Sequence, residues 1–133
     1  MDGSALQTCV WRTFAGRRMK FELRIGEIGE LERLTASGIG EIFFRMTTLR
    51  FKHADVRESI RLGMMGAGET EATATSLVSF YVDREPIGAH LQLAMDILTA
   101  CVNGVSPEGN GDGEGATSDA PATSSPSTEP AAP

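Results

Sequence analysis

The residue types that most often carry catalysis or bind metals are few in this chain and widely spaced. The 133 residues include two histidines, His53 and His90, and two cysteines, Cys9 and Cys101. Neither histidine has a Cys, His or carboxylate neighbour at the repeated spacing of a zinc site. No serine lies in a G-x-S-x-G elbow, which would present a strained nucleophile. We therefore predict no catalytic residue, no metal site and no cofactor, and expect a protein that is not an enzyme.

Glycines between the first apolar stretches offer a different chemistry, the binding of a phosphate group. Gly26, Gly29, Gly38 and Gly40 follow an expected strand and precede expected helices, as in nucleotide-binding loops. The stretch contains no G-x-G-x-x-G pattern and no Lys-Ser or Lys-Thr pair of a P-loop. We therefore interpret these glycines as turns, helix caps and points of close packing.

The formal net charge of −6 is distributed unevenly along the chain. Residues 1–104 hold all twelve basic residues and thirteen of the eighteen acidic ones, whereas residues 105–133 hold five acidic residues and no basic one. A nucleic-acid-binding module should present a basic face, so we predict no nucleic-acid partner. Five basic residues do cluster near the N-terminus: Arg12, Arg17, Arg18, Lys20 and Arg24. Solvated strand faces and an anion-binding patch are the two interpretations of this cluster.

The last part of the sequence, residues 105–133, differs in composition from the rest. It consists mostly of Gly, Pro, Ala, Ser and Thr, and Val105 is its one large apolar residue. Such a segment cannot bury enough apolar surface to offset the entropy of ordering its backbone. We predict a folded domain over residues 1–104 and a disordered acidic tail over residues 105–133.

The chain carries no recognisable targeting or membrane-spanning segment. Its first residues lack a basic region followed by an apolar run, and no stretch is long and apolar enough for a membrane span. These features predict a cytoplasmic protein with no membrane partner. The two cysteines are then expected to be reduced thiols, although a disulfide between them stays open.

Hydrophobic periodicity predicts a hairpin followed by helices. Apolar residues alternate over 10–14 and 19–25 around a turn at 15–18, which gives the second strand an apolar face of Met19, Phe21, Leu23 and Ile25. Helical spacing then predicts five short helices, over about 26–35, from an N-cap at Ser37 to about 46, about 55–66, about 70–81 and about 86–102, with a linker at 47–53. The predicted fold class is α+β, mostly α, with an N-terminal β-hairpin packed on a compact bundle of about five short helices and a disordered C-terminal tail.

Some large apolar side chains lie beside or off the inward stripes of these helices. They are Phe44, Phe51, Met65 and Phe80. Adaptable apolar residues left over after the core is filled are typical of a groove that binds a partner helix, so these four are the candidate partner-binding residues. The alternative is that a neighbouring helix covers each of them.

Four segments, in order and with similar spacing, resemble those of a small tail protein family. They are residues 21–32, 38–42, 55–68 and 81–86. The family is the gene transfer agent and siphophage tail assembly chaperone family, also labelled tail tube protein in gene transfer agent clusters. The resemblance covers about residues 10–104. Trp11 and the long tail depart from the family pattern.

The resemblance implies a role in assembly within the cytoplasm of a bacterial host cell. A tail assembly chaperone would bind the tape measure protein, keep it soluble, and give way to tail tube subunits; a tail tube protein and a second copy of the chain are further partners. A structural tail component, of the tube or its completion, is the first alternative. A small helical regulatory module is the second, but the expected third helix combines Arg57 and Arg61 with Asp55 and Glu58.

Overall fold

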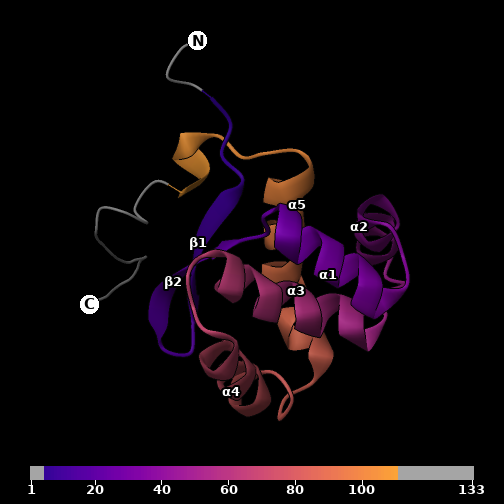
Figure 1. Cartoon of the computed structure of the whole chain (residues 1–133), viewed down its shortest axis with the longest axis vertical. Helices are drawn as coiled ribbons and strands as arrows, with labels where there is room; N and C mark the ends of the chain where they lie inside the picture. The colour runs from indigo at the N-terminus through magenta and orange to yellow at the C-terminus, as the bar shows by residue number, and fades with distance from the viewer. Residues whose placement is uncertain (1–4, 111–133) are drawn as a thin grey trace, which may run out of the picture.

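The computed structural model describes residues 5–110, which form an N-terminal hairpin followed by five α-helices (Figure 1). The elements are β1 (Cys9–Phe14), β2 (Arg17–Glu22), α1 (Ile25–Thr35), α2 (Ile39–Thr47), α3 (His53–Gly66), α4 (Glu71–Tyr81), the short 3₁₀ helix η1 (Ile87–His90), α5 (Leu91–Val102) and the short 3₁₀ helix η2 (Pro107–Asn110). This arrangement confirms the predicted fold class, a hairpin with a mostly helical domain. None of the described helices has the length and apolar character needed to cross a membrane.

The hairpin has a tighter turn than the four residues predicted for it. Arg17 and Arg18 belong to β2, because they pair with Phe14 and Thr13 across the ladder. Only Ala15 and Gly16 form the turn, and both have positive φ, 55° and 80°. A two-residue turn of this kind matches the right-handed twist of the strands, which keeps the two strands in register.

The second strand ends earlier than the alternating pattern predicted. Leu23 is buried as expected, but Ile25 begins α1 and leaves 86% of its surface exposed. The chain turns at Arg24, whose backbone N–H donates to the Glu27 carboxylate at 3.2 Å and so starts the helix. The prediction that Ile25 continues the apolar strand face was therefore wrong.

Helix α3 runs through the centre of the domain and packs against β2, α1, α4 and α5 (Figure 1). Its small residues allow this close packing. A Cβ atom added at Gly66 would lie 1.9 Å from the carbonyl oxygen of Glu22, so only glycine fits there. A Cβ at Gly63 would lie 3.4 Å from Ile97 and Phe21, in ordinary contact. The hairpin is thus seated directly on the backbone of α3.

Two predicted helix starts differ from the structure. The N-cap of α2 is Gly38, not Ser37, because the Ser37 hydroxyl donates to the Thr35 carbonyl and accepts from Arg45. Helix α3 begins at His53, inside the predicted linker. Asp55 lies in its first turn and accepts a hydrogen bond from the Lys52 backbone N–H at 2.8 Å, which caps the helix from within.

The first residues of the predicted disordered tail are part of the folded domain. Val105 and Gln7 exchange backbone hydrogen bonds, and η2 follows. Asn110 is fully buried: its Oδ1 accepts from the Trp11 backbone N–H at 3.1 Å, and its Nδ2 donates to the Cys9 carbonyl at 2.8 Å. One side chain thereby bonds two backbone groups on the outer edge of β1, and ordered structure extends past residue 104 into the first residues of the predicted tail. The rest of that tail, residues 111–133, lies outside the described residues.

Candidate functional site

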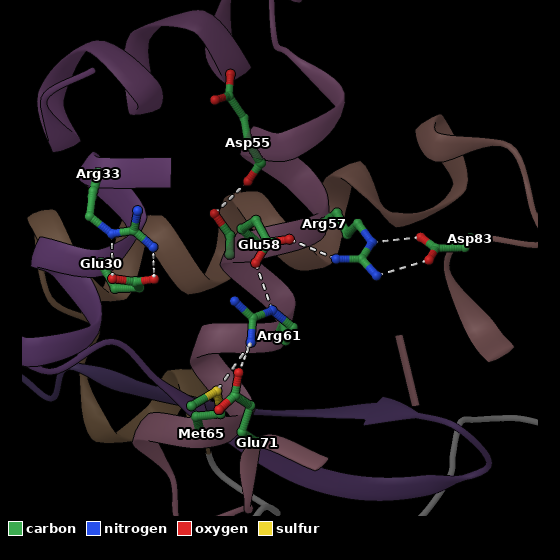
Figure 2. A network of polar contacts seen from close by, with 10 residues as sticks. Glu30, Arg33, Asp55, Arg57, Glu58, Arg61, Met65, Glu71 and Asp83 are labelled. Carbon is green, nitrogen blue, oxygen red and sulfur yellow. Dashed lines mark hydrogen bonds and ion pairs between the residues drawn. The ribbon is translucent and has the colours of Figure 1, made fainter. Parts of the chain in front are cut away.

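A row of charged side chains along α3 forms a network of polar contacts (Figure 2). Arg57 holds the Asp83 carboxylate with two hydrogen bonds, at 2.8 and 3.0 Å. Glu58 accepts from Arg57 at 2.7 Å and from Arg61 at 2.6 Å. Asp83 lies just beyond the C-terminal end of α4, so the row ties α4 to α3. Arg57 lowers the pKa of Asp83 because it stabilises the charged carboxylate.

A second ion pair joins α2 to the start of α3. Arg45 donates to both carboxylate oxygens of Asp55, at 2.9 and 2.7 Å, and the Asp55 side chain is fully buried. Glu41, one turn earlier on α2, also approaches Arg45, at 3.3 Å, but from an exposed position. The hydrogen bond to Asp55 raises the pKa of Arg45, which keeps the guanidinium charged. Both ion pairs serve to position helices.

The described residues contain no group of three or more His, Cys, Asp or Glu side chains that could hold a metal ion. Burial raises the pKa of the Cys101 thiol, which disfavours the reactive thiolate. His90 lies beside Glu85, at 3.0 Å, and its ring meets the edge of Phe14. These contacts pack η1 against the hairpin.

The four predicted partner-binding residues divide into two pairs. Phe44 on α2 and Phe80 on α4 are 62% and 55% exposed. Phe51 and Met65 are half-buried and pack against the core, and the Met65 sulfur accepts from Arg61 at 3.5 Å. Helices α2 and α4 lie apart in Figure 1, α2 beside α1 and α4 at the bottom of the view. The two exposed aromatic residues therefore belong to helices that are not close neighbours in the domain.

The surface of α4 around Phe80 is hollowed. Helix α4 buries only Ala74 and Val78, and its outward side carries small hydroxyl residues. A shallow hollow of about 330 Å³ is lined by Thr75, Ser76, Ser79, Phe80 and Arg84. The Arg84 guanidinium lies 4.5 Å from the centre of the Phe80 ring, in cation–π contact. Arg84 was not among the predicted partner-binding residues, although its spacing of four residues from Phe80 is a signal for such a contact.

The predicted basic cluster is divided by the sheet. Arg12 points to the helical side and pairs with Asp96 on α5 at 3.0 Å. Arg17, Arg18 and Lys20 line a second hollow of about 240 Å³ with Trp11, and Glu69 is also part of this lining. One of the five side chains thus helps to hold the hairpin on α5, and three line the second hollow.

The family relationship is given by a family model whose description reads phage tail tube protein, GTA-gp10. The model matches residues 10–104, from β1 to just beyond the end of α5. The chain belongs to this family. It is therefore a tail protein of a phage or gene transfer agent, from a family described by a structural role. No curated protein and no solved structure matches the chain.

The match to the tail tube family supports some of the functional predictions more than others. It agrees with the predicted phage and gene transfer agent origin and with association with other tail components. Its description supports the structural alternative better than the tape measure chaperone, which was the main prediction. The matched residues 10–104 include the charged row on α3 and the hollow on α4.

Proposed function

We propose that this protein is a structural component of a phage or gene transfer agent tail, a subunit of the tube or of its completion, and that it stays in the finished particle. The observation that carries the proposal is the match of residues 10–104 to the tail tube family. Assembly would take place in the cytoplasm of the bacterial host cell.

The distribution of charge and apolar surface supports this role. The buried Arg45–Asp55 pair and the charged row on α3 fix the helices relative to one another, which suits a rigid subunit. Exposed Phe44 and Phe80 leave apolar area for neighbours. Large exposed aromatic side chains are typical of the buried centre of protein interfaces.

A tape measure chaperone would need the exposed apolar residues to form one binding groove. It would hold a long helical partner in a continuous apolar groove and leave before the tail is complete. The division of the four predicted residues between two exposed positions and two half-buried ones offers less support for such a groove. The chaperone function predicts that the chain is absent from finished tails, whereas our proposal predicts that it is present, and the following experiment distinguishes the two.

The test is to follow this chain through purification of the finished particles. An epitope tag placed after Pro133, beyond the described residues, allows detection by antibody and by mass spectrometry. We expect the chain in purified tails together with the tape measure protein. If the chain occurs only in lysates, bound to the tape measure protein, and is missing from purified tails, the structural proposal fails and the chaperone function is favoured.

A further inference from the structure

The outer side of α2 combines an aromatic residue with a negative charge. Phe44 is 62% exposed, and Glu41, three residues earlier, lies on the same side of the helix with its side chain 64% exposed. The nearest positive group is Arg45, but its guanidinium is held by Asp55 and is largely buried. Glu41 also approaches this guanidinium, at 3.3 Å, so two carboxylates share one arginine and the remaining negative charge is exposed at Glu41. We call Glu41 and Phe44 the α2 face.

The hollow on α4 has the opposite character. Phe80 forms one wall of the hollow and Arg84 lies over its ring. The carboxylates next to Arg84 in the sequence are engaged elsewhere, since Asp83 binds Arg57 and Glu85 binds His90. No carboxylate among residues 5–110 forms an ion pair with Arg84. The hollow thus offers an aromatic wall and an available positive charge.

We infer that the α2 face of one copy of this protein docks into the α4 hollow of the next copy. Phe44 would enter the hollow beside Phe80, and Glu41 would pair with Arg84. Helices α2 and α4 lie apart in the domain, so the contact is one between two copies and not within one copy (Figure 1). A contact between two different patches is head-to-tail, and its repetition builds a ring or a helical filament. The inference rests on the proposed structural function and names the partner surface, a second copy.

The decisive experiment mixes two variants of the full chain, Phe44→Ser and Phe80→Ser. The wild-type chain is expected to form assemblies larger than dimers, and each variant alone is expected to be monomeric. An equimolar mixture should form dimers and nothing larger, because one intact α2 face then meets one intact α4 hollow. Sedimentation velocity measures all four samples, and circular dichroism shows that each variant is folded.

Charge reversal provides a second variant set that leaves both aromatic residues in place. Glu41→Arg and Arg84→Glu should each weaken association about tenfold, because each places like charges together. The chain that carries both substitutions should regain self-association. Ile25→Ser is the matched control, since Ile25 is an exposed apolar residue outside both surfaces, and it should associate like the wild type.

Three results would overturn the inference. They are a wild-type chain that stays monomeric up to its highest soluble concentration, single variants that assemble like the wild type, and a mixture of folded variants that stays monomeric. None of these three results decides whether the proposed function is correct. If the chain is present in purified tails but the mixture does not dimerise, the structural role stands and only this contact is wrong.

Discussion

The central helix α3 and the outer surfaces of α2 and α4 use similar residue types for opposite purposes. On α3, Arg57 and Arg61 both meet acidic side chains of the same chain, and Gly66 allows the sheet to approach the helix backbone. On the outer surfaces, Phe44 and Phe80 remain exposed. The comparison indicates that tight packing and internal ion pairs at the centre stabilise the domain. Exposed aromatic rings and an available charge at its ends suit association.

The largest expected effect comes from breaking the buried ion pair at the start of α3. Asp55→Ala should lower the free energy of unfolding by about 3–5 kcal/mol, because it leaves the largely buried Arg45 charge without its buried partner. Glu41→Ala is the matched control. It removes the other carboxylate of the same arginine from an exposed position, and should cost less than about 1 kcal/mol. Urea denaturation measures the free energy of unfolding of both variants. Equal losses would contradict the distinction between the buried and the exposed carboxylate.

Close packing between α3 and the sheet gives the next largest effect. Gly66→Ala should lower the free energy of unfolding by about 3 kcal/mol, since the new methyl group would collide with the Glu22 carbonyl. Gly29→Ala is the control in α1, where an added Cβ meets no atom within 4 Å. It should instead raise stability by about 0.5–1 kcal/mol through helix propensity. A neutral result for Gly66→Ala in thermal and urea unfolding would show that β2 is not seated on α3.

A substitution at the edge of the sheet is expected to lower the free energy of unfolding by less than one at the centre and by more than one on the outer surfaces. Asn110→Ala should cost about 1–3 kcal/mol, because the Trp11 N–H and the Cys9 carbonyl lose their partner. A chain ending at Gly104 should lose at least as much, whereas a chain ending at Asn110 should unfold like the full chain. Equal stability of the two truncated chains would place the end of the folded domain at residue 104, as the sequence analysis predicted.

Much of this fold could be predicted from hydrophobic periodicity, and the errors have local physical causes. Helix α4 begins after Thr70 as predicted, because the Thr70 hydroxyl accepts from the Thr73 N–H. The prediction placed Ile25 in the strand because alternation continues to that residue, whereas capping by Glu27 starts the helix. Asn110 gave no signal, since its partners lie about a hundred residues earlier and the surrounding composition is that of a tail.

The candidate surfaces could be predicted in part. Phe44 and Phe80 lie off the inward stripes of their helices, and both are exposed. Phe51 and Met65 show the same sequence pattern but are half-buried against the core, because burial of a second helix face depends on how the helices pack. The charges that Glu41 and Arg84 expose could not be identified from sequence. Glu41 shares Arg45 with the buried Asp55, and Arg84 has no acidic partner among the described residues because Asp83 pairs with Arg57 and Glu85 with His90.

The central claim is that the outer surfaces serve association while the centre provides stability. The most direct test measures unfolding and self-association of Phe80→Ser on the same sample. The account predicts a free energy of unfolding within about 1 kcal/mol of the wild type, because an exposed ring contributes little to the core, together with loss of assemblies in sedimentation velocity. A loss of stability as large as that of Gly66→Ala, or undiminished association, would contradict it.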